Sequence, residues 1–289
     1  DAQGLLSRAV AAMDQPSHDG LNTYAISEAI HNAGLKVAVS GQGSDELFLG
    51  YPQRHGFPRF ARTAALGPRQ IAGLLHGLGR MGSRGVDSKI GKLAGVVGAR
   101  RPLAGAYLGM HSVFSYAAVQ RLRGEARPHP ERFVEAVSAD DPLDALSRLQ
   151  LRHYLKDTLL RDADQMSMAH SLELRAPFVD HDLVELALTV PARHKLDPER
   201  NKPLLLDAVG QSLPREVWDR PKQGFAMPVG RWLLEGASVF EGDGVPGLSA
   251  EAVAAVRREF VQGGRPYGYV RTWTLEVLGA WLARHGVSG

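Results

Sequence analysis

The sequence contains no cysteine in its 289 residues. Disulfides, thiolate metal sites and a cysteine nucleophile are therefore excluded within this chain, and the absence fits a reducing cytoplasm, where we expect the protein to reside. No apolar run approaches the length of a membrane span, so no membrane partner is predicted. The histidines show no His-x-x-x-His spacing, so a zinc site is not predicted either.

A strong excess of one charge is also missing. Lys and Arg total 34 against 31 Asp and Glu, which gives a net charge of +3. Basic residues are scattered among acidic ones, so a nucleic-acid-binding surface is not predicted. With 44% hydrophobic and 22% charged residues, the chain can bury a substantial core and is globular. Its length allows one large domain or two small ones.

The segment 36–51 combines a short apolar run with a turn rich in glycine and serine. Residues 37–39 predict a buried central strand of a parallel sheet, over about 36–40. Gly41 and Gly43 let backbone N–H groups approach an anion closely, and the acidic pair at 45–46 then opens a short helix. This order is typical of nucleotide binding at the carboxyl ends of parallel strands. Asp45 is then expected to reach phosphate oxygens through Mg²⁺, which prefers carboxylate ligands.

An ordinary strand-to-helix turn, with Ser44 as its N-cap, explains some of the same residues. The full string 40–51, Ser-Gly-Gln-Gly-Ser-Asp-Glu-Leu-Phe-Leu-Gly-Tyr, is more specific. It resembles the Ser-Gly-x-Gly-x-Asp-Glu-x-Phe-x-Gly-Tyr signature of the synthetase domain of glutamine-hydrolysing asparagine synthetases.

Two later segments resemble the same family, in the family's order. Residues 154–181 end in Ser-Met-Ala-His-Ser-Leu-Glu-Leu-Arg-Ala-Pro-Phe-Val-Asp-His, and residues 220–228 read Arg-Pro-Lys-Gln-Gly-Phe-Ala-Met-Pro. In the last of these, Lys222 lies on a Pro/Gly-bounded loop, where a mobile cation can neutralise charge developing on pyrophosphate. The alternatives are a lone surface lysine at Lys222, and a structural ion-pair network at the turn around Pro177. The loop 14–24 is either plain turn chemistry or the family's segment before the nucleotide loop.

The resemblance implies ATP-dependent amide formation. Aspartate would attack the α-phosphate of ATP, giving β-aspartyl-AMP and pyrophosphate, and ammonia from a glutaminase domain or subunit would then attack the acyl-adenylate. The implied ATP contacts are Ser40, Gly41, Gly43 and Tyr51, the implied Mg²⁺ ligand is Asp45, and the implied catalytic positions are Gln42, Glu173 and Lys222. Tyr51 and Glu173 would also line the acyl-acceptor side of the pocket.

Four departures from the family pattern leave the substrate open. The Ser-Gly-Gly-x-Asp-Ser pyrophosphate loop is absent, and so is the glutaminase domain. Gln42 replaces a Glu and cannot act as a base. Asp162 and Gln165 differ from the Lys and Arg of one family version, and Leu49 replaces a Gly. The alternatives are an amide ligase or macrolactam cyclase of a biosynthetic pathway, of the β-lactam synthetase or lasso-peptide cyclase kind, and a non-catalytic remnant or split subunit.

The expected fold is α/β: part of a Rossmann-like, adenine nucleotide alpha hydrolase-like parallel sheet with a predominantly α-helical remainder. We expect residues 1–289 to form one synthetase domain that lacks its N-terminal pyrophosphate-loop strands, as if cut from a longer protein. Helices are predicted over 5–13, 21–33, 105–122, 163–172 and 202–213, and from Pro142 with Asp141 as N-cap. Trp273, Val277 and Trp281 are predicted core residues of a last helix. No second strand is evident, and a homodimer stays open.

Overall fold

The computed structural model describes residues 1–66, 92, 96, 99–125, 133–219, 224, 227–240, 242, 244–263 and 268–287. Within these residues the protein is a mostly helical α/β structure with a small parallel sheet. The elements discussed below are α1 (Ala2–Ala11), α2 (Leu21–Asn32), β1 (Val37–Val39), α3 (Ser44–Leu47), η1 (Pro52–His55), α4 (Phe57–Leu66), α7 (Pro102–His111), α8 (Tyr116–Arg123), α9 (Pro142–Leu149), η3 (Gln150–Leu160), α10 (Arg161–Met168), β2 (Glu173–Arg175), α11 (His181–Thr189), α12 (Pro203–Val209), α13 (Arg215–Trp218), α14 (Val229–Leu234), α15 (Ala250–Gly263) and α16 (Val270–Arg284).

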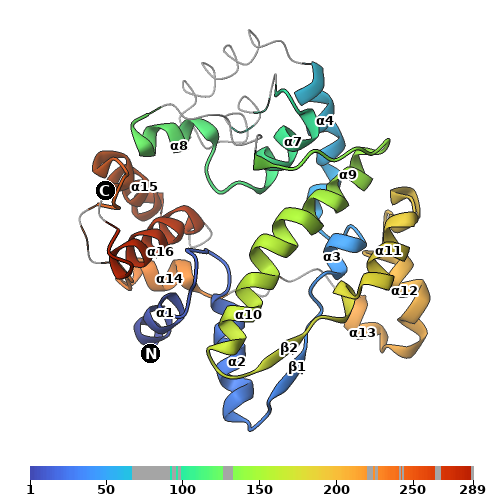
Figure 1. The fold of residues 1–289 in the computed structure, drawn as a ribbon, viewed down its shortest axis with the longest axis horizontal. Helices are drawn as coiled ribbons and strands as arrows, with labels where there is room; N and C mark the ends of the chain where they lie inside the picture. The colour runs from blue at the N-terminus through green and yellow to red at the C-terminus, as the bar shows by residue number, and fades with distance from the viewer. Residues whose placement is uncertain are drawn as a thin grey trace.

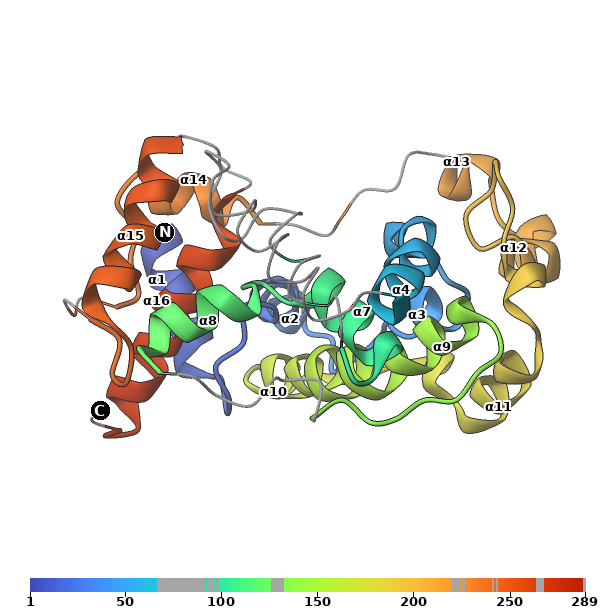
Figure 2. The same cartoon turned by 90° about the horizontal axis from the view of Figure 1, so that it is seen from above.

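The helices form an elongated body whose two ends come from different parts of the chain (Figures 1 and 2). Helix α1 lies at one end beside α14, α15 and α16, so the first and last helices are neighbours. Helices α11, α12 and α13 form the other end. A nearly continuous rod of α9, η3 and α10 runs through the middle, with α3 beside it.

The sheet consists of β1 and β2, which pair in parallel with Val37 opposite Glu173 and Val39 opposite Arg175. The predicted strand over 36–40 is confirmed. Its predicted burial is wrong, because Val37 and Val39 are 43% and 73% exposed. Among the described residues β1 has one strand neighbour, so it is an edge strand there and both valines remain accessible to solvent.

Strand β2 was not predicted, because its three residues, Glu-Leu-Arg, show no apolar run and follow directly on the helix predicted over 163–172. Helix α10 ends at Met168, earlier than the predicted end at 172. Ser171 takes a left-handed backbone conformation with φ 53°, and this turn redirects the chain into β2. The turn at Ser171 therefore accounts both for the early end of α10 and for strand β2, which was not predicted.

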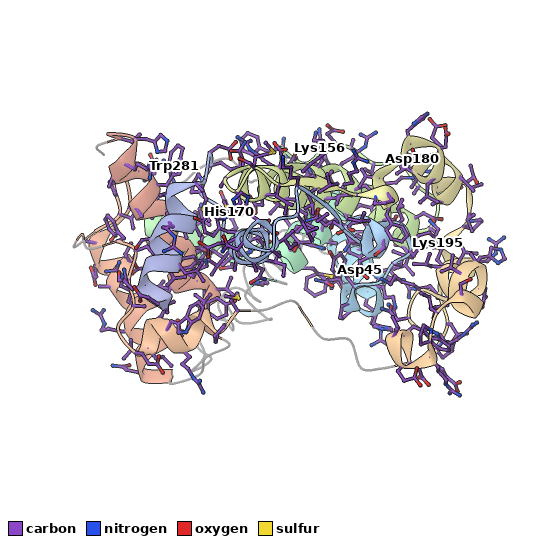
Figure 3. The ribbon with its side chains drawn as sticks, turned by 90° about the horizontal axis from the view of Figure 1, so that it is seen from below. Asp45, Lys156, His170, Asp180, Lys195 and Trp281 are labelled. Atoms are coloured by element: carbon purple, nitrogen blue, oxygen red, sulfur yellow. The ribbon has the colours of Figure 1, made fainter. Side chains whose placement is uncertain are left out.

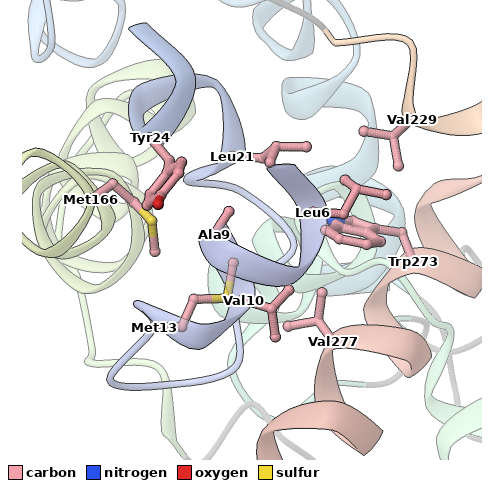
Figure 4. Close-up of a cluster of buried hydrophobic side chains, with 10 residues drawn as sticks. All are labelled: Leu6, Ala9, Val10, Met13, Leu21, Tyr24, Met166, Val229, Trp273 and Val277. Atoms are coloured by element: carbon pink, nitrogen blue, oxygen red, sulfur yellow. The ribbon is translucent and has the colours of Figure 1, made fainter. Parts of the chain in front are cut away.

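A buried apolar cluster joins α1 and α2 to α10 and α16 (Figure 4). Leu6 of α1 is completely buried, and Trp273 and Val277 of α16 are each 1% exposed. The predicted core role of Trp273 and Val277 is confirmed, and Trp281 packs on the same cluster from its edge. The indole N–H of Trp273 also donates to the backbone oxygen of His18 at 3.1 Å, which ties α16 to the loop before α2.

The central rod begins as predicted. Asp141 accepts a hydrogen bond from the backbone N–H of Leu143 at 2.7 Å, and Pro142 occupies the first position of α9. The rod continues through η3, an 11-residue π-helix. Because π-helical turns are rare and often lie at functional sites, this segment directs attention to the side chains it carries.

The predicted helix over 105–122 is wrong as one element. Helix α7 ends at His111 and α8 begins at Tyr116. The Ser115 hydroxyl accepts a hydrogen bond from the backbone N–H of Ala118 at 3.2 Å, so this residue caps a new helix instead of continuing the old one. None of the helices in the part of the chain that the structure describes is both long and apolar enough to cross a membrane.

Candidate nucleotide site

The turn between β1 and α3 gathers five of the predicted site residues. The Ser40 N–H donates to the Arg175 backbone oxygen at 2.7 Å, which extends the pairing of β1 with β2 by one residue. Gly43 has φ 95°, and a β-carbon there would lie 3.1 Å from the Phe178 backbone oxygen. Gly41 is exposed, and a β-carbon there would meet nothing within 4 Å. The backbone at Gly41 is therefore open to an approaching anion.

Asp45 carries the only charge of this turn that faces α12. Its Oδ1 lies 3.2 Å from Nζ of Lys202, which also donates to Ser44 Oγ at 3.2 Å. A β-carbon on Gly50 would overlap Asp45 Oδ1, so this glycine is required for the close approach of the carboxylate. Figure 3 shows Asp45 on α3, between the central helices and the α11–α13 end of the molecule.

Lys202 is held in an unusual backbone conformation. Its φ of 54° lies in the left-handed region, although it is not a glycine. Such a conformation costs on the order of 1 kcal/mol and persists where the surrounding structure requires it. Pro203, the first residue of α12, follows directly and fixes the start of that helix. The strained residue is thus the one that brings a cation to the turn between β1 and α3.

Asp45 and Lys202 lie at one end of a cavity of about 580 Å³. Arg54 and Asn201 line the same end, and the Arg54 guanidinium donates to Leu49 O at 2.8 Å and to Asn201 Oδ1 at 2.7 Å. The rest of the lining is mostly apolar and includes Leu205, Leu206, Val209, Leu213, Val217 and Trp218. The volume is in the range of small-molecule and cofactor sites, with charged groups gathered at one end.

The Asp45 carboxylate at this end of the cavity fits a magnesium ion if phosphate oxygens supply further ligands. Asp45 is the one carboxylate that lines the cavity among the described residues, and its side chain is 23% exposed. Mg²⁺ is often held by one or two carboxylates together with substrate phosphates and water. The residues therefore fit Mg²⁺ where phosphate oxygens supply the other ligands, with Lys202 as a second positive charge at the same place.

On the opposite side of the turn, Gln42 contacts the end of the π-helix. Its side-chain amide donates to the Leu159 backbone oxygen at 3.3 Å, and its Oε1 accepts no hydrogen bond from the described residues. Tyr51 directs its hydroxyl into the interior, where it donates to Glu46 Oε1 at 2.7 Å. Glu46 is 1% exposed, and burial raises the pKa of its carboxyl.

The loop 14–20, between α1 and α2, is fixed to α10. The Ser17 hydroxyl donates to Asp162 Oδ2 at 2.6 Å, and Arg161 pairs with Asp14 at 2.8 Å. Asp162 is 4% exposed, and burial raises the pKa of its carboxyl to about 6. The loop is therefore attached through a buried acid whose ionisation is unfavourable.

Replacing Asp162 by Asn is expected to stabilise the protein at neutral pH. Because the folded-state pKa is raised, the wild-type protein loses stability as pH rises from about 4 to about 6, and that loss persists above pH 6. Asn still accepts from Ser17 but carries no charge. Urea unfolding should show that the substitution increases the free energy of unfolding by on the order of 2 kcal/mol at pH 7.5 and by almost nothing near pH 4. The control, exposed Asp164→Asn on the same helix, should change neither value. A gain that does not depend on pH would contradict the account.

The structure therefore places most predicted site residues together. Around the turn lie Ser40, Gly41, Gln42, Gly43 and Asp45, with Tyr51 joined to it through Glu46. Glu173 is exposed, pairs with Arg175 at 2.9 Å, and stands opposite Val37, at the far end of β1 from the turn. Arg175, rather than Glu173, is the β2 residue next to Ser40. Lys222 lies outside the described residues.

Lys202, Arg54 and Asn201 were not predicted from the sequence. A lysine placed directly before a proline at a helix start was the available signal, but it is common and indicates only the helix boundary. What makes Lys202 a site residue is a contact with Asp45, 157 positions earlier in the chain, and no local pattern encodes that contact.

Comparison with known proteins agrees with the geometry. The family model described as asparagine synthase matches residues 1–282, and the chain belongs to this family. A protein of Mycobacterium tuberculosis (strain ATCC 25618 / H37Rv), provisionally named a glutamine-hydrolysing asparagine synthetase, is 30% identical over 262 residues, which are 86% of this chain and 39% of the relative.

Two other relatives extend the comparison. Asparagine synthetase 1 of Bacillus subtilis (strain 168), named glutamine-hydrolysing, is 28% identical over 206 residues, 69% of this chain and 32% of the relative. A Penicillium rubens protein named amidase chyE is 24% identical over 249 residues, 75% of this chain and 36% of the relative. The chain thus spans about two fifths or less of the length of these curated relatives. No solved structure matches it.

Proposed function

We propose that this chain is the synthetase part of an ATP-dependent carbon–nitrogen ligase of the asparagine synthetase type. The observation that carries the proposal is the juxtaposition of Asp45 and Lys202, 3.2 Å apart, with the open backbone at Gly41 on the family's first motif. One carboxylate for a metal, one cation and exposed backbone N–H groups are together the requirements of a phosphate site.

In the proposed reaction, each group of this chain binds or orients one part of the substrates. The backbone N–H of Gly41 and the hydroxyl of Ser40 hold the α-phosphate, where the substrate carboxylate attacks and an acyl-adenylate forms. Asp45 holds Mg²⁺, which supplies charge neutralisation on the phosphates when bound. Lys202 and, from its loop, Lys222 neutralise the charge that builds on departing pyrophosphate. Ammonia then attacks the acyl carbon and AMP leaves.

The sheet supports the proposal that a further polypeptide completes this site. Val37 and Val39 are exposed on a parallel strand, and parallel sheets are normally covered on both faces. The parallel pairing directs the N–H and C=O groups of alternate β1 residues away from β2, toward the open edge. We propose that strands from a further segment or subunit pair there to give a Rossmann-like sheet, and that a glutaminase domain or subunit supplies ammonia.

A second candidate is a related amide ligase or macrolactam cyclase with another acid and amine. Gln42, a neutral amide whose Oε1 is without a partner among the described residues, favours it. An amide at this position binds a substrate but does not remove its proton. The apolar wall of the 580 Å³ cavity also gives room for a substrate larger than aspartate.

Pyrophosphate release tests the proposal. The chain would be produced together with the polypeptide encoded directly upstream, and a panel of acids and amines, including aspartate and ammonia, would be supplied with ATP. Release is expected only with the correct acid present, and Lys222→Ala should abolish it. Release that is unchanged in Lys222→Ala would remove the third motif from the mechanism, and no release with any acid would contradict a ligase.

A further inference from the structure

A second cavity, of about 440 Å³, lies between α8 and the pair α15 and α16. Figure 2 shows these three helices together at one end of the molecule, whereas α3 and α12, at which Asp45 and Lys202 meet, lie toward the other end. Among the described residues the two cavities have no lining residue in common. The volume is in the range of small-molecule sites, so the second cavity can hold a ligand that takes no part in the reaction proposed above.

The apolar part of this lining comes from two helices that are joined at their ends. It consists of Ala118 and Leu122 of α8 and Ala252, Ala255 and Val256 of α15. Both α8 residues are buried, and the Ser249 N–H donates to the Leu122 backbone oxygen at 2.6 Å, which ties the end of α8 to the start of α15. Three of the five side chains are alanines, so little side-chain volume lies between the helices. An apolar group of a ligand would gain contacts there.

Charged side chains of both signs line the same cavity. Among the described residues they are Arg121 of α8, Glu251 and Glu259 of α15, and Arg271 of α16. Arg271 and Glu259 pair with each other, because two guanidinium nitrogens donate to the Glu259 carboxylate at 3.3 Å. The side chains of Arg121 and Glu251 form no ion pair or hydrogen bond, with each other or with any other residue that the structure describes. The cavity thus presents one unpaired cation and one unpaired anion together with an apolar surface.

This arrangement favours a ligand that carries both charges. A simple anion would meet two glutamates as well as the arginines, and a metal ion would meet two arginines, so neither finds an excess of opposite charge. An α-amino acid carries a carboxylate and an ammonium group on one carbon, from which its side chain also projects. We propose that the cavity binds an α-amino acid with an apolar side chain, whose carboxylate pairs with Arg121, whose ammonium pairs with Glu251 and whose side chain contacts Leu122 and the α15 alanines. Binding here is independent of the proposed function, because none of these residues lines the first cavity.

Saturation-transfer difference NMR on the full chain, without ATP, tests the binding with L-leucine and L-phenylalanine as probes. Saturable binding of at least one of them is expected. The amide of that amino acid lacks the carboxylate charge, and its N-acetyl derivative lacks the ammonium charge. Each should bind roughly tenfold more weakly or worse than the parent amino acid, because each loses one of the two ion pairs. No saturable binding of either probe, or equal binding of the amide and the N-acetyl derivative to that of the parent, would overturn the proposal.

Substitution of Arg121 locates the bound amino acid. Arg121→Gln should weaken its binding roughly tenfold or more and remove its advantage over the amide. Arg123→Gln is the matched control, because Arg123 lies on the same helix and pairs with Glu125 at 3.2 Å but does not line the cavity; it should bind the amino acid as the wild type does. Both arginines are exposed, and Tm measured for each variant confirms that it folds. Equal weakening in the two variants would overturn the proposal. Loss of binding in Lys202→Ala would also overturn it, since the amino acid would then occupy the first cavity.

Discussion

Replacing Lys202 by Ala is expected to slow acid-dependent pyrophosphate release by roughly 10²–10³-fold. The ammonium group of Lys202 lies 3.2 Å from Asp45 Oδ1, at the charged end of the cavity. A charged group that stabilises developing charge in a site shielded from water commonly contributes this much to the rate. The backbone of Lys202 is strained, with φ 54°, which indicates that the surrounding structure holds the side chain beside Asp45 despite this energetic cost.

The control for this prediction is Lys156→Ala. Lys156 is 65% exposed on η3 and pairs with Asp157, so its removal should leave the rate within twofold of wild type. Both variants would be compared at saturating ATP in the completed enzyme, with Tm measured alongside to confirm folding. A Lys202→Ala rate equal to that of Lys156→Ala would show that Lys202 only neutralises Asp45 and takes no part in the reaction.

At Leu49, substitution by Gly is expected to destabilise the protein less than substitution by Ala. This is the reverse of the usual order at a buried position. Leu49 is 1% exposed and packs in a cluster with Phe57 and Leu146, yet its φ of 53° is left-handed. Leu49→Ala should cost about 3 kcal/mol or more, because it removes buried methyl groups and keeps the strain. Leu49→Gly should cost about 1 kcal/mol less than Leu49→Ala, since glycine adopts this conformation without strain.

Leu146 is the matched control for Leu49. It belongs to the same cluster and is equally buried, but it lies within the regular helix α9. The Leu146→Gly protein should therefore be less stable than the Leu146→Ala protein by about 1 kcal/mol. Urea unfolding of the four variants measures both differences. If Leu49→Gly proved less stable than Leu49→Ala, the left-handed strain at Leu49 would be absent, and this departure from the family's Gly would have no energetic meaning.

Local chemistry made part of the fold predictable from the sequence. Asp141 and Pro142 begin α9, and Trp273 and Val277 face the core, because a cap and a helical period are each encoded within a few residues. The same local signals failed at Ser115, which starts a new helix, and at β2. Three residues with one apolar side chain carry no strand pattern, and β2 becomes a strand only because β1 lies beside it.

The residues of the candidate site also divide into those that a local motif predicts and those that depend on tertiary packing. Ser40, Gly41, Gln42, Gly43 and Asp45 were predictable because one short turn contains them all. Lys202 was not, since its role depends on how α12 packs against α3. Glu173 was expected to line the acyl-acceptor side of the pocket because the family resemblance implied it. The strand register instead places it beside Val37, away from the turn.

The central claim, that a carboxylate is activated on the α-phosphate of ATP at this turn, is tested most directly with an acid labelled with ¹⁸O in its carboxylate. In the completed enzyme the account predicts that AMP is the nucleotide product and that it carries ¹⁸O from the acid, because the bridging oxygen of the acyl-adenylate leaves with AMP. Formation of ADP with ¹⁸O in inorganic phosphate, or unlabelled AMP, would contradict the account.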